Sequence, residues 1–421
     1  MARFENIVFF SPCKFTGGAE YYFIRIAQYL SKQYPEYNIY YADYANNWTS
    51  SLVDDYNIKK LVYETGKKTL IPPKSIICIS SHLLPQIHDL ILFDSENTVL
   101  TLWFMHLRHL SGFCTMGNYY KISRSARINI GGEIKWLYDN GIFNILGNGA
   151  LLKLSQQFLF KYEPKMSVPI PVPTDKYGNV EIRNRFPDKQ IRFCWLGRLD
   201  KEKAKNILTY MNELELVRRG KNISLSIIGV GIAESMLKSK AKKYSYPIYF
   251  VGEKREAELD SFITKNVDIG LASGTSSLEF ALRKVPVIQE WLLDKVYSAD
   301  QRKTYHLVEE YGNFINITEY DFQIVNQGTF SQKLHQILGD YNKYCESAYN
   351  RAMTRSPQMC GDKFVAVMHN LEHVDIKESS YHLDSLSKML QSARNNWMEK
   401  IHLRRIFVPL CKILGIKPAV M

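Results

Sequence analysis

The chain has 421 residues, too many for one ordinary hydrophobic core, and its length suits two domains of about 150–200 residues each. Hydrophobic residues make up 46% and charged residues 23%, which is typical of a soluble globular protein, and no run of about 18 apolar residues predicts a membrane-spanning helix. The net charge of +12 suits a phosphate-bearing substrate, an anionic lipid surface or nucleic acid, but no zinc-finger or ribonucleoprotein motif supports nucleic acid.

The N-terminus and the cysteines indicate the compartment. The apolar run 7–10 is too short for a secretory signal. The 7 cysteines are scattered singly, without Cys-x-x-Cys or a Cys/His cluster, which argues against a disulfide scaffold and a structural zinc site. These observations predict a protein of the reducing cytoplasm.

The first half of the chain alternates short apolar strands with helices. Strands are predicted over residues 6–10, 38–42, 75–80 and 98–103, and helices over 19–33 and 83–93. Such alternation favours a parallel sheet covered by helices on both faces. Residues 161–175 then contain four prolines, which excludes regular helix or central strand and indicates an interdomain linker.

After the linker the pattern restarts. Strands are predicted over residues 191–196, 224–229, 248–251, 268–271 and 286–288, and helices over 204–218, 233–244, 255–264 and 276–283. The fold prediction is α/β, with two Rossmann-like doubly wound domains facing a cleft and a C-terminal helical extension. The predicted bounds are 1–165 for the first domain, 166–188 for the linker, 189–372 for the second domain and 373–421 for the extension.

The extension is basic and amphipathic, with no acidic residue after Glu399. Apolar side chains such as Trp397 and Phe407 lie among lysines and arginines, a combination that suits an anionic membrane surface. A terminal helix packed on the first domain is the alternative, and Pro409 would interrupt a single long helix.

Two motifs of the second domain predict a diphosphate site. Gly197, Arg198 and Lys203 follow a strand and open a helix, where parallel sheets place ligands and helix N-termini bind anions. Two fixed cations there would stabilise the charge of a departing diphosphate in place of a metal, and the chain contains no Asp-x-Asp. The alternative is a solvated first helical turn. Gly229, in a Gly-Val-Gly turn, would let main chain approach the nucleotide or would only form a tight turn.

The second motif is the turn of Gly274, Thr275, Ser276 and Ser277, followed by Glu279. Hydroxyls and main-chain N–H groups at a helix start suit a phosphate, and a carboxylate that accepts two hydrogen bonds suits a ribose diol. The alternative is a capping turn with an ordinary surface glutamate.

The first domain offers weaker candidates. Gly17 and Gly18 would allow backbone to approach a ligand, and His106 follows a predicted strand, where a structural histidine is the alternative. A further basic cluster at helical spacing would meet an anionic acceptor or lipid headgroup, or would be a solvated face; it consists of Lys121, Arg124 and Arg127.

Taken together, the segments 197–203, 227–231 and 278–288 resemble the C-terminal domain of GT-B glycosyltransferases of the family-4 type, and 16–20 is similar to that family's N-terminal donor loop. The resemblance implies two Rossmann-like domains, Arg198 and Lys203 on the donor diphosphate, Glu279 on the ribose and His106 near the transferred sugar. It also implies a reaction that retains anomeric configuration. The sequence departs from the family where Leu271 occupies the position of the first of two paired glutamates, and where 272–275 replaces an acidic sugar-contacting segment.

The resulting prediction is a retaining, metal-independent glycosyltransferase without cofactor that uses a nucleotide-sugar, with UDP as the expected nucleotide. Its expected acceptor is a glycan or a lipid-linked glycan of bacterial surface polysaccharide, met in the cytoplasm with possible contact to the inner membrane face. One alternative is a non-catalytic GT-B partner subunit, which Leu271 favours and the retained Arg198, Lys203 and Glu279 oppose. Another is a sugar-nucleotide 2-epimerase, which would need a cluster of acids and histidines that the sequence does not offer.

Overall fold

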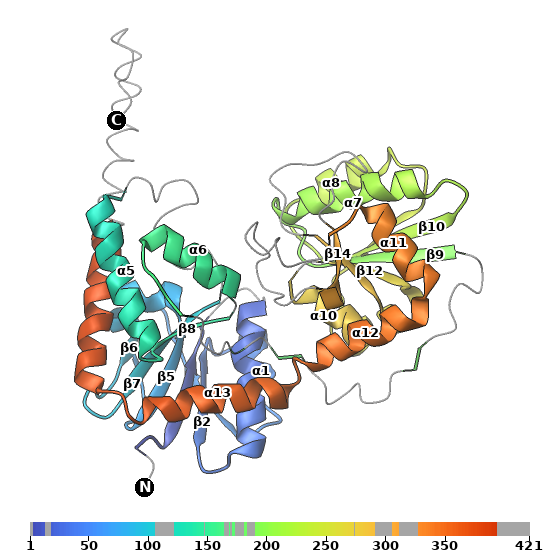
Figure 1. Cartoon of the computed structure of the whole chain (residues 1–421). Coiled ribbons are helices and arrows are strands. Elements are labelled where there is room, and N and C mark those ends of the chain that lie inside the picture. The colour runs from blue at the N-terminus through green and yellow to red at the C-terminus, as the bar shows by residue number, and fades with distance from the viewer. Residues whose placement is uncertain are drawn as a thin grey trace, which may run out of the picture. The chain divides into compact units, whose positions relative to one another are not determined.

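The computed structural model describes residues 3–12, 18–105, 122–146, 148–163, 168, 171–172, 181–182, 190–272, 274–290, 305–310 and 327–393. The chain divides into two compact units, one formed by Met1–Val168 with Lys363–Met421 and the other by Pro169–Asp362 (Figure 1). None of the helices in the described ranges is long and apolar enough to cross a membrane.

The first unit is built on a parallel sheet with strand order β3-β2-β1-β5-β7-β8. The strands are β1 (Asn6–Phe10), β2 (Asn38–Asp43), β3 (Ile58–Val62), β5 (Ser75–Ser80), β7 (Val99–Phe104) and β8 (Phe143–Ile145). A separate pair of short strands consists of β4 (Thr69–Leu70) and β6 (Ile91–Leu92). The helices are α1 (Gly18–Gln33), α2 (Trp48–Ser51), η1 (Ser81–Gln86), α3 (Ile87–Leu90), α5 (Arg124–Asp139) and α6 (Asn148–Phe158). This order is that of a Rossmann-like doubly wound sheet.

The second unit repeats the arrangement, with strand order β11-β10-β9-β12-β13-β14, in which only the edge strand β14 is antiparallel. The strands are β9 (Gln190–Leu196), β10 (Asn222–Ile228), β11 (Ile248–Gly252), β12 (Ile269–Ala272), β13 (Val287–Gln289) and β14 (His306–Leu307). The helices are α7 (Lys203–Val217), α8 (Glu234–Ala241), α9 (Glu256–Asn266), α10 (Ser276–Leu282), η3 (Val308–Glu310), α11 (Phe330–Gly339), α12 (Tyr341–Met353) and the start of α13 (Pro357–Leu371).

Helices cover both faces of this second sheet (Figure 1). Apolar residues of α7, α8 and α11 pack on one face, and those of α9, α10 and α12 pack on the other. Strands covered on both faces are expected to be mostly apolar, as residues 193–196 of β9 and the whole of β12 are.

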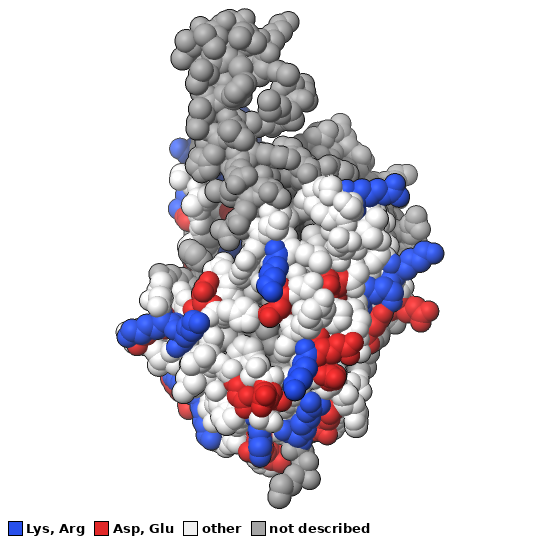
Figure 2. Space-filling model, turned by 90° about the vertical axis from the view of Figure 1, so that its left-hand side faces the viewer, with Lys and Arg blue, Asp and Glu red and all other residues white. Residues whose placement is uncertain are grey.

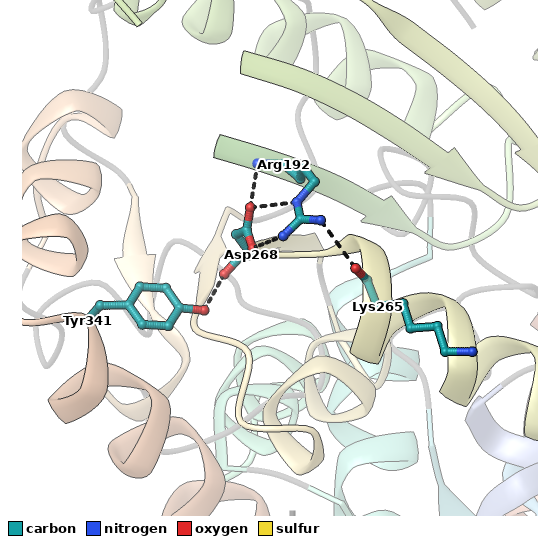
Figure 3. Close-up of polar contacts among 4 residues, drawn as sticks. All are labelled: Arg192, Lys265, Asp268 and Tyr341. Atoms are coloured by element: carbon teal, nitrogen blue, oxygen red, sulfur yellow. Dashed lines mark hydrogen bonds and ion pairs between the residues drawn. The ribbon is translucent and has the colours of Figure 1, made fainter. Parts of the chain in front are cut away.

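A buried ion pair fastens the amino-terminal edge of the same sheet (Figure 3). Asp268, whose side chain is fully buried, accepts hydrogen bonds from the main-chain N–H of Arg192 and from its guanidinium, with Nη2 3.0 Å from Oδ1. Arg192 also donates to the Lys265 carbonyl, and the Tyr341 hydroxyl donates to the Asp268 carbonyl. The cluster therefore ties β9 to the ends of α9 and α12, at the edge opposite to the carboxyl ends of the strands.

The second half of α13 contributes to the core of the first unit. The ring of Phe364 stacks on Trp103 with centroids 5.2 Å apart and also contacts Phe9. Because these residues form one aromatic core, the chain from residue 363 onward groups with the first unit, whereas the sequence analysis assigned residues up to 372 to the second domain.

Residues 376–393 form a helix that packs on the first unit. The His382 ring stacks on Trp136 of α5 with centroids 3.8 Å apart, and its Nδ1 lies 2.5 Å from Oε2 of Glu133. Ser385 donates to the other oxygen of the same carboxylate. This part of the predicted extension therefore follows the packing alternative. The basic residues on which the membrane alternative rests, beyond 393, lie outside the described ranges. On the face seen in Figure 2, positive and negative side chains of the described residues are interspersed.

One predicted element of the first half is wrong. The segment 83–93 was expected to be a single helix, but it consists of the end of η1, then α3 and then β6. Pro85 lies inside η1 and lacks the N–H that a regular helix would need, so the segment divides into short pieces.

Candidate active site

The candidate site is built on the carboxyl ends of β9 and β12, which are neighbours at the point where the strand order of the second unit reverses. Open α/β sheets bind their ligands at this point, outside the carboxyl ends of the strands. β9 ends at Leu196 and continues into Gly197, whereas β12 ends at Ala272 shortly before the Gly274 turn. Both predicted motifs are thus brought to the same edge of one sheet.

The loop after β9 is held by the loop after β10. Gly197 donates its N–H to the Ile228 carbonyl, and Leu199 donates its N–H to the Val230 carbonyl. Gly229 has φ +137°, and a Cβ on it would lie 2.1 Å from the Gly197 carbonyl oxygen. Gly231 approaches the Leu199 carbonyl in a similar way. The glycines of the Gly-Val-Gly turn therefore allow two loops to pack main chain against main chain, and this supports the loop after β9.

Asp200 determines where α7 begins. Its Oδ1 accepts hydrogen bonds from the main-chain N–H groups of Glu202, at 3.1 Å, and of Lys203, at 2.8 Å. A carboxylate at this place caps a helix and favours its positive end. Its other oxygen lies 3.6 Å from Nη2 of Arg198. Sequence analysis overlooked Asp200, although an aspartate three residues before Lys203 is a recognisable capping signal.

The ammonium group of Lys203 lies directly beside Gly197. A Cβ on Gly197 would be 3.4 Å from Nζ of Lys203 and 3.7 Å from Oγ of Ser276, so a cation from one motif and a hydroxyl from the other border the same point. Desolvation, followed by repulsion from Arg198, lowers the pKa of Lys203, and the Asp200 carboxylate opposes this shift. Within the described residues, no carboxylate lies at ion-pair distance from the Lys203 ammonium.

The Gly274 turn uses some of its polar groups internally. Ser277 is fully buried and its hydroxyl donates to the Gly274 carbonyl at 2.6 Å, so this hydroxyl serves the turn and not a ligand. Thr275 precedes α10 without making a side-chain capping hydrogen bond. Gly274 has φ +67°, a conformation that favours glycine, and the turn directs Ser276 toward Gly197.

Glu279 is partly buried and paired. Its Oε2 lies 3.1 Å from Nη1 of Arg283, one helical turn further on. Arg283 is almost fully buried, and its Nε also donates to Asp260 at 2.9 Å. Glu279 is therefore not the ordinary surface glutamate of the alternative interpretation. Its carboxylate is oriented by a buried guanidinium, which the sequence analysis did not identify.

The predicted residues of the first unit are only partly described. His106, Gly17 and Lys121 lie outside the described residues, and Gly18 is the first residue of α1. Arg124 is exposed at the start of α5. Arg127 donates to the carbonyls of Gln156 and Gln157 at the end of α6, so its guanidinium serves a contact between two helices instead of standing free for an anionic acceptor.

The position of Leu271 explains one departure from the resemblance. Leu271 lies within β12 and is fully buried in the apolar core of the second unit, on the row of Trp195 and Ile288. The position is part of a strand interior, where an acidic side chain would be desolvated, and not part of the strand-end loop.

Chemically, the site combines one exposed guanidinium, one partly desolvated ammonium and a serine hydroxyl around a glycine main chain. Positive groups at the beginning of a helix suit an anion with several oxygens, such as a phosphate or diphosphate. The described residues contain no group of three or more His, Cys, Asp or Glu that could hold a metal ion.

No protein-family profile and no curated protein matches the sequence. Solved structures do match. The "lipopolysaccharide outer core galactosyltransferase WaaB apo form" aligns with 86% of this chain and 99% of its own, at a TM-score of 0.51 and 13% identity. The structure described as "Trehalose-6-phosphate from E. coli bound with UDP-2-fluoro glucose" aligns with 88% of this chain and 99% of its own, at a TM-score of 0.53 and 11% identity. The chain has the GT-B fold.

A third similar structure, TarM, is longer. This chain aligns over 70% of its own length but spans only 55% of TarM, at 14% identity and a TM-score of 0.44. The two full-length matches and the two Rossmann-like sheets confirm the predicted fold class. At identities of 11–13%, these matches show the fold alone.

Proposed function

We propose that this chain is a metal-independent glycosyltransferase that transfers a sugar from a nucleotide-sugar, with UDP as the nucleotide, and retains anomeric configuration. The observation that carries the proposal is the meeting of Lys203 Nζ and Ser276 Oγ beside Gly197, at the switch point of the second sheet. The GT-B fold supports it, because the similar solved structures are described as a galactosyltransferase and as a complex with a fluorinated UDP-glucose.

In this proposal the donor diphosphate lies on Lys203, Arg198 and the Gly197 main chain. When the bond between sugar and diphosphate breaks, negative charge grows on the leaving phosphate, and the cations of Lys203 and Arg198 would stabilise it. Lys203 is suited to this, because its ammonium group is desolvated without a carboxylate at ion-pair distance among the described residues, and a bound phosphate would supply that negative partner. The Glu279 carboxylate, oriented by Arg283, would accept hydrogen bonds from the ribose hydroxyls.

The proposed acceptor is a glycan or lipid-linked glycan of surface polysaccharide, such as capsule or lipopolysaccharide, and the proposed location is the cytoplasm, with peripheral contact to the inner face of the membrane. The net charge of +12 supports an anionic surface or a phosphate-bearing partner. A non-catalytic partner subunit is the second candidate. It is favoured because the position at which the family resemblance implies a glutamate is occupied by the core residue Leu271.

Calorimetry with UDP, GDP and their common sugar conjugates tests the proposal. UDP is expected to bind the wild-type chain, and Lys203→Met should weaken it about 10–100-fold, because a charge-assisted hydrogen bond to phosphate is lost. Glu279→Gln should weaken the nucleoside part of the interaction. Asp260→Asn is its matched control, since it removes the other carboxylate on Arg283 and leaves Glu279 in place.

Three outcomes separate the candidates. UDP binding together with hydrolysis or transfer of a UDP-sugar supports the enzyme. UDP binding without any turnover in the presence of a total lipid-linked glycan extract supports the partner subunit. If neither UDP nor GDP binds the wild type, both the nucleotide site and the proposed function are wrong.

A further inference from the structure

A basic surface lies at the amino-terminal edge of the second sheet. α7 and α8 lie side by side on one face of that sheet (Figure 1), and each ends at the edge where the next strand, β10 or β11, begins. The cations around these two helix ends are here called the basic edge, and they are Arg218, Arg219, Lys221, Lys238, Lys240, Lys242 and Lys243.

Hydrogen bonds hold the two helix ends together. In the turn after α8, the Tyr244 hydroxyl donates to Oδ1 of Asn212 at 2.8 Å. Ser245 donates its main-chain N–H and its hydroxyl to the Glu215 carboxylate. Because Asn212 and Glu215 belong to the second half of α7, the cations that follow α7 and those of α8 form one surface.

Positive charge dominates the basic edge. Residues 215–249 include seven lysines and arginines but only two acidic residues, Glu215 and Glu234, which gives a net charge of +5. Both acids are already paired, with Arg218 and Lys238 respectively, each at 2.7 Å. The other five cations are exposed and have no carboxylate at ion-pair distance among the described residues.

Helix stability explains only part of this charge. A cation in the last turn of a helix interacts favourably with the helix dipole, and Lys238 and Lys240 occupy such positions in α8. Arg219, Lys221 and Lys243 lie beyond the helix ends, in the turns that lead to β10 and β11, where this effect has largely fallen off. Since crowded like charges repel one another and disfavour the compact state, these cations indicate an anionic partner.

The neighbouring apolar side chains indicate which anionic partner fits. Leu216 at the end of α7, Met236 on α8 and Tyr249 near the start of β11 are exposed by 36%, 40% and 55%. A membrane interface accepts such side chains while its anionic headgroups attract cations. Lysine is depleted at protein–protein interfaces, and five of the seven cations are lysines, which favours a lipid surface over an acidic protein.

We propose that the basic edge binds the headgroups of an anionic phospholipid membrane. The nucleotide site lies at the carboxyl ends of β9 and β12, at the opposite edge of the same sheet, so lipid bound at the basic edge leaves it uncovered. The inference names a surface for the membrane contact in the proposed function and rests on that part alone, because it does not depend on nucleotide binding.

The test is lysine footprinting of the full chain. Exposed lysines are acetylated with and without vesicles, and the modification of each lysine is measured by mass spectrometry. Vesicles of equal parts phosphatidylcholine and phosphatidylglycerol are the probe, and vesicles of phosphatidylcholine alone are the neutral control. Three exposed lysines of the first unit serve as matched control sites: Lys60, Lys67 and Lys68.

The anionic vesicles are expected to protect Lys240, Lys242 and Lys243, whereas the control lysines should be modified at an unchanged rate. Neutral vesicles should protect none of them, and added salt should reduce the protection, because exposed charges are screened.

Variants measure the strength of the contact by vesicle flotation. Replacing Lys240, Lys242 and Lys243 together by glutamine should lower the affinity for anionic vesicles about tenfold or more, since each cation near an anionic surface contributes about fivefold. Replacing Lys60, Lys67 and Lys68 by glutamine removes the same charge elsewhere and should preserve the affinity.

Polyglutamate and a single-stranded oligonucleotide, at equal charge concentration, are the opposing probes. The proposal is overturned if anionic vesicles leave the basic edge unprotected, if both triple variants lose affinity equally, or if either opposing probe protects the basic edge more strongly than the vesicles do. UDP calorimetry on the same variants is independent of these outcomes, so failure of the lipid surface and failure of the nucleotide site are distinguishable.

Discussion

Gly229→Ala tests how the candidate site is supported, because this glycine lies behind the loop of Gly197. Two terms add in the variant. A non-glycine residue at φ +137° is strained by about 1–2 kcal/mol, and the new Cβ would lie 2.1 Å from the Gly197 carbonyl oxygen, an overlap that costs about 1–3 kcal/mol to relieve. We therefore expect a loss of about 3 kcal/mol from the free energy of unfolding of the second unit. For a unit of this size, the loss corresponds to a fall in Tm of about 6–12 °C.

The matched control is Gly220→Ala. Gly220 also has a positive φ, +74°, but a Cβ there meets no atom within 4 Å, so this variant carries the backbone strain without the overlap. Denaturant unfolding followed by tryptophan fluorescence compares the two, and calorimetry measures UDP affinity. Gly229→Ala should lose at least tenfold in UDP affinity, since the Gly197 loop must move, and Gly220→Ala should keep it. Equal stability loss in the two variants would refute the reasoning that Gly229 is required by the close contact of the loops.

Three further predictions concern the two units. Asp268→Asn should cost about 3 kcal/mol in the unfolding free energy of the second unit, because it leaves the Arg192 guanidinium without its buried carboxylate; a loss below about 1 kcal/mol in guanidinium unfolding would contradict this. Phe364→Ala should cost about 3–5 kcal/mol and should act on the first unit, which limited proteolysis of each unit can distinguish; loss confined to the second unit would be inconsistent with its packing on Trp103. Because the pKa of Lys203 is lowered from its ordinary 10.5, Lys203 binds more protons in the unfolded chain than in the folded chain between the two values, so its contribution to stability should rise with pH over that window and Lys203→Met should remove this contribution. Unfolding curves between pH 7 and about 10.5 check this, and an unchanged pH slope in Lys203→Met would count against it.

Much of the second unit could be predicted from the sequence. Mostly apolar strands and helices with one apolar face depend on local periodicity, so β9, α7 and β12 were placed within one or two residues. The signals that position Lys203 and Ser276 are also local, since each follows the end of a strand. That both belong to the same edge of a sheet follows from the rule for parallel strands.

Other features lacked a local signal. The split of 83–93 depends on Pro85 and on carbonyls that Ser387 and Gln391, about three hundred residues later, satisfy. The second half of α13 belongs to the first unit because Phe364 packs on Trp103, and no pattern along the chain predicts this contact.

The sequence by itself therefore determined the two doubly wound sheets and the end of each strand at which ligands bind, because periodicity and strand-end turns are properties of neighbouring residues. Only the tertiary structure decided which polar groups remain available there. Ser277 is used by a turn, Arg127 by a contact between two helices, and Glu279 is oriented by Arg283. Partners of this kind are set by packing between distant segments, and their identity cannot be read from spacing along the chain.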